Sequence, residues 1–364
     1  MSVLQQFPGV HWVWHGSISF VYEVHPLIVV KVPKPGELER EQFQHEIKVY
    51  EIFSQNPPCP SIVQCFLYTD NGIFLEYMRD VSLYCRIHNN NNYDPETRLV
   101  TKVDRLEPPA LRKEWMNDIT QAVAFLESLN LAHGDLRPEN ILLDRDRLKL
   151  SDFDCSAEPG TDFEACMAPY GRILNGDEVD QGARGTSGFL GPRTEQFALG
   201  SIFYLINYGF EVYGNQSLTE DPGEHGPKVE DLLQNMKFPT LDGDPLIDEM
   251  INKCWHNKYA AIAELATYTK TLLLERNTGS DINTETTPVP ECATDEATQF
   301  ETVDSENPDG SASDMCQYQW PEDFSSKKEF CQSLEKRGLL EVLSSGEPNQ
   351  LGFELKFYSY SERS

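Results

Sequence analysis

Residues 133–144, with the sequence HGDLRPENILLD, decide the fold of this chain, and the triplet Asp152-Phe153-Asp154 follows them closely. Carboxylate and amide oxygens, such as those of Asn140 and Asp152, are the ligands that Mg²⁺ prefers in proteins. A further carboxylate, Asp135, is placed to accept a proton from a hydroxyl group. The pattern therefore predicts two adjacent loops that hold metal and orient a hydroxyl beside the phosphates of a nucleotide.

This stretch resembles the catalytic loop of protein kinases, H-R-D-L-x-x-x-N, followed by D-F-G. We identify the chain as similar to the eukaryotic-type protein kinase superfamily, and within it to divergent protein-kinase-like proteins of fungi. The resemblance implies an α+β, bilobal fold with a small β-rich N-lobe and a larger, mainly α-helical C-lobe. We place the N-lobe at residues 1–78, the C-lobe at 79–275, an acidic disordered linker at 276–316 and a short segment of unknown role at 317–364.

The resemblance assigns a role to each polar residue of the catalytic loop. Asp135 is the expected catalytic base, and the charge of Arg137 neutralises the transferring phosphoryl group. Arg137 stands where Ser/Thr kinases carry Lys, and its planar fork is not equivalent to a lysine. Asn140 and Asp152 are the expected ligands of Mg²⁺, and ATP and Mg²⁺ are the implied cofactors. We interpret His133 as a structural support of the loop.

Lys31 ends the strand-like run LIVVK and resembles the kinase lysine that contacts ATP phosphates. Residues 37–53 follow with apolar side chains at helical spacing, which predicts an amphipathic helix. Glu46 lies beside the apolar face of this helix and is the best candidate partner for Lys31. Glu41 and Glu51 are the less favoured alternatives.

The expected phosphate loop precedes this strand and is degenerate. Trp14, Gly16 and Ser19 stand at the three glycine positions of the G-x-G-x-x-G pattern. Gly16 and Ser17 are nevertheless our candidates for backbone contacts to phosphate, although a Trp leaves less room there.

Two further strands, at 65–68 and 72–76, lead to a segment similar to the hinge between kinase lobes. Backbone groups of Glu76 and Met78 are the expected partners of adenine. The asparagine-rich, polar run from 89 to 109 indicates a loop insertion.

Helical periodicity predicts a helix at 111–129, which delivers the chain to the catalytic loop, and an apolar helix at 197–210. Three further positions depart from the family pattern. Gly134 replaces an Arg that clamps a phosphorylated activation loop, so we do not expect activation by loop phosphorylation. Asp154 replaces the Gly of D-F-G, and Arg193 replaces the Glu that pairs with a C-lobe Arg, so that pair is lost or rebuilt.

Composition excludes several classes of function. The chain has 364 residues and a formal net charge of −29, which disfavours nucleic-acid binding. Nine scattered cysteines without a C-x-x-C pair do not indicate structural zinc, and they favour a cytoplasmic or nuclear protein with reduced thiols. The apolar run at 197–210 is too short for a membrane span. After residue 323, residues 324–343 indicate helix and 352–360 indicate a strand.

The favoured function is ATP-dependent phosphorylation of Ser/Thr hydroxyls in a protein substrate. One alternative is a small-molecule phosphotransferase similar to aminoglycoside or choline kinases, which Gly134 and Asp154 favour. The matching segment from Gly185 to Pro192 argues instead for a peptide substrate. A third interpretation is a pseudokinase scaffold without turnover, which the missing glycines, Asp154 and Arg193 favour.

Overall fold

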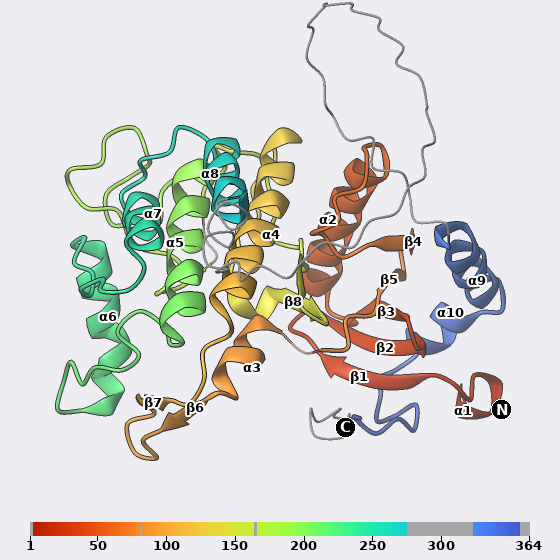
Figure 1. Ribbon diagram of the computed structural model, residues 1–364. Helices are drawn as coiled ribbons and strands as arrows, with labels where there is room; N and C mark the ends of the chain where they lie inside the picture. Colours follow the sequence, from red (N-terminus) through yellow and green to blue (C-terminus); the bar gives the residue numbers. More distant parts are fainter. Residues whose placement is uncertain (1–2, 81, 164–165, 275–322, 357–364) are drawn as a thin grey trace, which may run out of the picture.

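The computed structural model describes residues 3–80, 82–163, 166–274 and 323–356, and its elements form two lobes (Figure 1). The expected linker at 276–316 lies outside the described residues. The N-lobe is built on an antiparallel sheet of five strands in the order β1-β2-β3-β5-β4. Its elements in chain order are α1 (Val3–Gln6), β1 (His11–His15), β2 (Ser19–His25), β3 (Ile28–Pro33), α2 (Glu37–Ser54), β4 (Cys65–Thr69) and β5 (Gly72–Glu76).

The side chains of strand β3 lie alternately on the two faces of the N-lobe sheet, because successive side chains of a strand point to opposite sides. Val30 and Val32 belong to the apolar cluster on the outer face of the sheet. Val29 belongs to the inner core that continues into the C-lobe, and Lys31 lies on the same side, toward α2. The alternation therefore directs Lys31 into the interior of the molecule.

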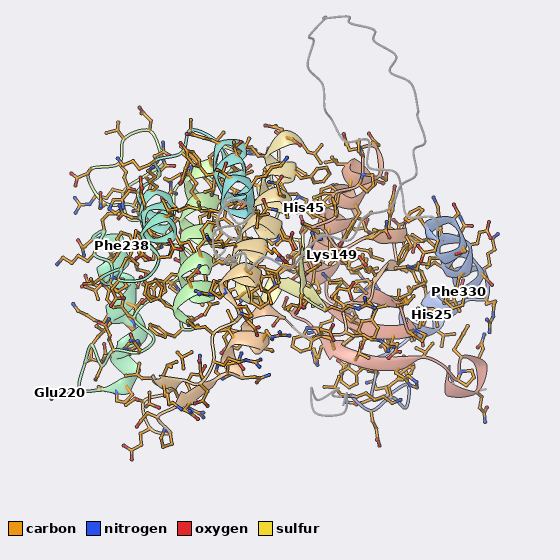
Figure 2. All side chains as sticks on the ribbon, in the orientation of Figure 1. His25, His45, Lys149, Glu220, Phe238 and Phe330 are labelled. Carbon is orange, nitrogen blue, oxygen red and sulfur yellow. The ribbon has the colours of Figure 1, made fainter. Side chains whose placement is uncertain are left out.

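The outer face of the sheet is covered by the C-terminal segment, which returns to the N-lobe (Figure 1). Helices α9 (Phe324–Lys336) and α10 (Leu339–Leu343) supply Leu334 and Leu340 to the same cluster as β3. Phe330 of α9 makes an edge contact with the ring of His25 at the end of β2 (Figure 2). The helices expected after residue 323 are present. The strand expected at 352–360 is wrong for its described part, since 352–356 have no strand geometry and residues 357–360 lie outside the described range.

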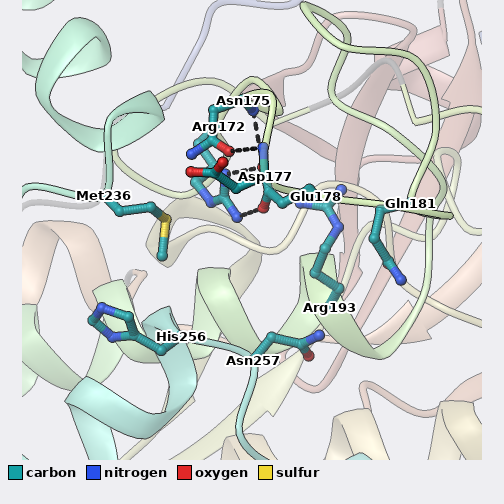
Figure 3. Close-up of a pocket in the computed structure, with 9 residues that line it drawn as sticks. All are labelled: Arg172, Asn175, Asp177, Glu178, Gln181, Arg193, Met236, His256 and Asn257. Carbon is teal, nitrogen blue, oxygen red and sulfur yellow. Dashed lines mark hydrogen bonds and ion pairs between the residues drawn. The ribbon is translucent and has the colours of Figure 1, made fainter.

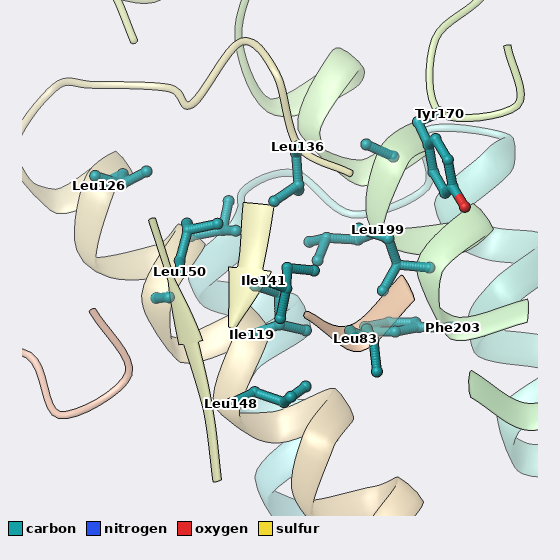
Figure 4. Packing of buried hydrophobic residues seen from close by; sticks show 14 of the residues in the cluster. Leu83, Ile119, Leu126, Leu136, Ile141, Leu148, Leu150, Tyr170, Leu199 and Phe203 are labelled. Carbon is teal, nitrogen blue, oxygen red and sulfur yellow. The ribbon is translucent and has the colours of Figure 1, made fainter. Parts of the chain in front are cut away.

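The C-lobe is mainly helical, with α4 and α5 at its centre. Its helices are α3 (Leu83–His88), α4 (Pro109–Ser128), α5 (Pro192–Tyr208), α6 (His225–Gln234), α7 (Pro245–Trp255) and α8 (Ile262–Leu274). Most of the apolar stripe of α4 is buried, and Ile119 and Leu126 belong to the same core as Leu199 and Phe203 of α5 (Figure 4). The bilobal α+β architecture predicted from the sequence is thus confirmed.

Two hairpins complete the C-lobe. β8 (Ile141–Asp144) and β9 (Arg147–Leu150) join the catalytic loop to Asp152. The expected loop insertion at 89–109 was wrong in part, because β6 (Asn91–Tyr93) pairs with β7 (Val100–Val103). Among the described residues, no helix combines the length and the apolar character that a membrane crossing requires.

Candidate functional site

Lys31, Glu46 and Asp152 come together between the lobes, although they lie on β3, on α2 and after β9. The Nζ of Lys31 donates a hydrogen bond to Glu46 Oε2 at 2.6 Å and a second one to Asp152 Oδ1. Glu46 is completely buried, whereas the alternative partners Glu41 and Glu51 are exposed. The contact joins α2 to the C-lobe through a single ammonium group.

Burial and charge oppose one another in this cluster. Burial lowers the pKa of Lys31, but Asp152, Glu46 and Asp154 outweigh it and hold that pKa above its ordinary value. Burial raises the pKa of Glu46 to about 7, although Lys31 acts in the opposite direction. Burial also raises the pKa of Asp152, but Lys31 more than reverses the effect and leaves that pKa below its ordinary value. Lys31 and Asp152 are therefore charged at neutral pH.

The catalytic loop holds Asp135 through two neighbours. Nδ2 of Asn140 donates to the backbone oxygen and to Oδ2 of Asp135, both at 2.9 Å. Nε of Arg137 lies 3.1 Å from the same Oδ2, so Arg137 contacts the expected base itself. His133 is fully buried, and its Nε2 lies 3.0 Å from the carbonyl oxygen of Ser151, which fits a structural role.

The donor atoms in this loop fit Mg²⁺. Because Nδ2 of Asn140 is used on Asp135, its Oδ1 remains without a hydrogen bond to any described residue. Asp152 gives Oδ1 to Lys31 and likewise keeps Oδ2. Mg²⁺ is commonly bound by one or two protein oxygens together with phosphate and water. The described residues contain no group of three or more His, Cys, Asp or Glu side chains suited to a metal.

Glu195 holds the catalytic loop in place, a role that was not predicted from the sequence. Its carboxylate accepts from the backbone N–H of His133 at 3.0 Å and from that of Gly134 at 3.4 Å. Burial raises the pKa of Glu195, against the effects of His133 and of the two N–H groups. Residues 195–200 are similar to the D-x-W-S-x-G pattern of kinases, and that likeness is the local signal that could have pointed to Glu195.

Gly134 cannot be replaced without strain. Its φ is +80°, and a Cβ built there would overlap the carbonyl oxygen of Cys155. The departure from H-R-D is therefore tied to the path of the segment after Asp154. The ring of His45 on α2, labelled in Figure 2, lies 2.9 Å from the carbonyl oxygen of Asp154 through Nδ1. This contact gives α2 a second link to the same segment.

The ring of Phe153, the middle residue of the triplet 152–154, packs against both α2 and the catalytic loop. Phe153 is fully buried and meets Tyr50 and Phe53 of α2 edge to face, with centroid separations of 5.6 and 5.1 Å. It also packs against His133 at 5.4 Å. Phe153 thus connects α2 to the catalytic loop through apolar contacts, beside the ionic contact of Lys31.

The expected nucleotide contacts at the edge of the site have mixed geometry. The N–H of Gly16 donates to the oxygen of Ser19 at 3.0 Å, so the hairpin turn already uses this amide. Ser17 is exposed at the tip of the same turn. In the hinge, Met78 is buried, and the carboxylate of Glu76 pairs with Lys149 at 2.7 Å. The roles of these residues in nucleotide binding stay predictions.

Comparison with known proteins gives a consistent result. The family described as protein kinase domain matches residues 16–258. CBL-interacting serine/threonine-protein kinase 20 of Arabidopsis thaliana is 25% identical over 166 residues, which cover 41% of this chain and 36% of that protein. Human MAP kinase-activated protein kinase 2 is 27% identical over 148 residues, which cover 38% of this chain and 34% of that protein. CBL-interacting protein kinase 20 of Oryza sativa subsp. japonica is 24% identical over 279 residues, which cover 67% of this chain and 56% of that protein. The match therefore spans from about a third to just over half of the length of these relatives.

Proposed function

The chain belongs to the protein kinase family, and on this premise we propose that it transfers the γ-phosphoryl group of ATP to Ser or Thr hydroxyls of protein substrates. The observation that carries the proposal is the convergence of Lys31, Asp135, Asn140 and Asp152, linked by the contacts of Lys31 and Asn140 described above. The Ser/Thr relatives support the class of acceptor, at identities of about a quarter.

In the proposed reaction the substrate oxygen attacks the γ-phosphorus, and the bond from that phosphorus to ADP breaks. Asp135 accepts a hydrogen bond from the hydroxyl and takes its proton late in the transfer. Asn140 orients the carboxylate of Asp135, and Lys31 positions the phosphates. Mg²⁺, when bound through Asn140 and Asp152, offsets the charge of the phosphate oxygens.

A protein substrate is favoured by the segment that follows Asp152. Met167, Val179 and Phe189 expose large apolar side chains on it. Such surfaces suit a polypeptide better than a small, polar amino alcohol. The seven described cysteines form no disulfide, which is compatible with the cytoplasmic or nuclear location that we propose.

One observation favours a second candidate, a scaffold that binds nucleotide without turnover. The turn at Gly16 uses its own amide internally, and exposed Trp14 stands at a glycine position. A backbone cradle for phosphates is therefore less complete here than in the G-x-G-x-x-G pattern.

The decisive experiment combines nucleotide binding with turnover. Purified chain is given labelled ATP and Mg²⁺ together with a Ser/Thr peptide library or a panel of amino alcohols, and thermal shift follows ATP binding. We expect peptide phosphorylation, and a loss of roughly 10²- to 10⁴-fold in Asp135→Asn with ATP binding retained. Asp144→Asn, an exposed aspartate at the end of β8, is the matched control.

Each other outcome rejects the proposal in a different way. Phosphorylated amino alcohols without phosphopeptide assign a small-molecule enzyme. Nucleotide binding without any turnover assigns a scaffold. Equal turnover in wild type and Asp135→Asn rejects Asp135 as the base.

A further inference from the structure

A second charged site lies beside the start of α5, and none of its lining residues belongs to the nucleotide site. It is a cavity of about 290 Å³ between residues 172–181, the first turn of α5 and the end of α7 (Figure 3). Arg172 and Glu178 line one side, Arg193 and Gln181 another, and His256 and Asn257 lie opposite. Nothing in the proposed transfer reaction uses these side chains.

Arg193 carries a buried charge that makes no direct ion pair with a carboxylate in the described part of the chain. It is only 6% exposed, and it forms no ion pair within 4.0 Å of a carboxylate in the described part of the chain. Its Nη2 donates to the carbonyl oxygen of Ser187, while its Nε is buried without an acceptor. Burial lowers the pKa of Arg193 to about 10 and nearby Arg172 acts in the same direction, whereas Glu178 acts against both. The side chain therefore stays cationic at neutral pH.

The half-buried carboxylate of the cavity, that of Glu178, is already engaged. Glu178 accepts from Nη1 of Arg172 at 3.0 Å and also from Nη2. Arg172 further lies over the ring of Phe197, 5.6 Å from its centroid, which fixes the plane of its guanidinium. Its Nε is buried without an acceptor, as is that of Arg193. Asp177 is exposed and lies where solvent screens it.

The cavity is therefore lined by two guanidinium groups, the engaged carboxylate of Glu178 and the exposed carboxylate of Asp177, and both guanidinium groups have a buried Nε–H without an acceptor. A water molecule would satisfy a donor but would leave Arg193 without a direct ionic partner, and an unpaired buried charge is strongly unfavourable. Guanidinium forks match the oxygens of phosphate, which accepts several charge-assisted hydrogen bonds at once. The side-chain amide of Gln181 has no partner among the described residues and supplies a further donor.

We propose that this cavity binds a phosphate group, with Arg193 as its main cationic contact and Arg172 and Gln181 as additional donors. The group is either inorganic phosphate or the phosphate ester of a phosphorylated side chain, because both present the same oxygens. The loss of the family's Glu at position 193 thus creates a phosphate site in this lobe.

The test measures binding and does not depend on catalysis. Full-length chain is titrated with inorganic phosphate at constant ionic strength, and thermal midpoint and isothermal calorimetry are recorded. We expect a saturable rise of the midpoint, and at least a tenfold weaker affinity in Arg193→Gln. Arg184→Gln, an exposed arginine of the same segment, should bind as wild type does. Lys31→Ala removes phosphate binding in the nucleotide site and should leave the Arg193-dependent part unchanged.

Further arms decide the source of the phosphate and guard against misfolding. A peptide containing phosphoserine that binds where its unphosphorylated form does not assigns a phosphorylated side chain, and binding of inorganic phosphate alone assigns the free ion. Arg193→Lys keeps the charge without the fork, so weakened binding in a variant with wild-type circular dichroism supports the geometry. The proposal is overturned if Arg193→Gln binds phosphate as wild type does, or if acetate binds as tightly as phosphate.

Discussion

The packing of α10 against the N-lobe sheet predicts a coupling between two side chains far apart in the sequence. Leu340 is 4% exposed and lies over Gly72, where a Cβ would come within 2.5 Å of Leu340 Cδ2. Gly72→Ala should therefore destabilise the protein by overpacking, by about 1–3 kcal/mol. Leu340→Ala removes buried methyl groups and should cost about 2–5 kcal/mol.

The double variant distinguishes this contact from two unrelated defects. With Leu340 truncated, the added methyl of Gly72→Ala enters the vacated space, so the two changes should compensate partly. We expect the double variant to be more stable than the sum of the single changes by roughly 1 kcal/mol, within the range seen for residues in contact. The losses expected for the two single changes are a substantial fraction of the ~5–15 kcal/mol stability of a typical protein.

Urea unfolding followed by tryptophan fluorescence measures the cycle, since Trp12 is buried in the same cluster. Leu246→Ala is the control, because this leucine is 50% exposed on α7 and should neither destabilise strongly nor couple to Gly72→Ala. Additivity of Gly72→Ala and Leu340→Ala within about 0.5 kcal/mol would refute the packing of the C-terminal segment on this face.

Three other changes test the candidate site. Gly134→Ala should lower the free energy of unfolding by more than ~1 kcal/mol, and by more than Gly160→Ala does. Both glycines have positive φ, but a Cβ meets a neighbouring carbonyl only at Gly134. Equal losses for the two variants in urea unfolding would contradict this. Burial raises the pKa of Glu46 to about 7, so this group stabilises the fold below its unfolded pKa near 4.5 and the contribution is lost as pH rises through 7. The unfolding free energy of wild type minus that of Glu46→Gln should accordingly fall between pH 5 and pH 8, and a rise would reverse the assignment. Glu195→Ala leaves two buried N–H groups of the catalytic loop without an acceptor and should cost about 1–3 kcal/mol, whereas Glu195→Gln, which keeps an acceptor, should lose less in the same assay.

The sequence predicted those parts of the fold whose signal is local. Alternation of apolar residues around Lys31 and the apolar stripe of residues 111–129 each report a periodicity that the backbone imposes. The catalytic loop was found because its chemistry requires several polar residue types within a few positions. The pairing of Lys31 with Glu46 followed once β3 and α2 were assigned, because only Glu46 among the candidates borders the buried face of the helix.

Features that depend on distant partners were not predictable in this way. Asn91 and Asn92 have low strand propensity. Asn91 Nδ2 nevertheless donates to the carbonyl of Gly209 at 2.6 Å, and Val100 N–H donates to that of Gly214 at 2.8 Å. These anchors after α5 hold the β6–β7 hairpin against the local preference of its residues. The packing of α9 and α10 on the sheet was not predictable either, since the apolar face of an amphipathic helix does not reveal which surface it covers.

The charge of the candidate site leads to a last prediction, on the need for metal. Lys31 and Arg137 face Glu46, Asp135, Asp152 and Asp154, so two cations against four acids give a formal charge of −2 when all are ionised. Asp154 adds to this repulsion, although burial and Asp152 raise its pKa. We expect ATP to stabilise the protein weakly in EDTA and strongly with Mg²⁺, because the metal must offset both the triphosphate and the excess carboxylates. Asp154→Asn should increase the shift by ATP in EDTA, while Asp144→Asn, an exposed change of equal charge, should not. If ATP alone stabilises the wild type as strongly as ATP with Mg²⁺, the acidic side chains do not face the phosphates.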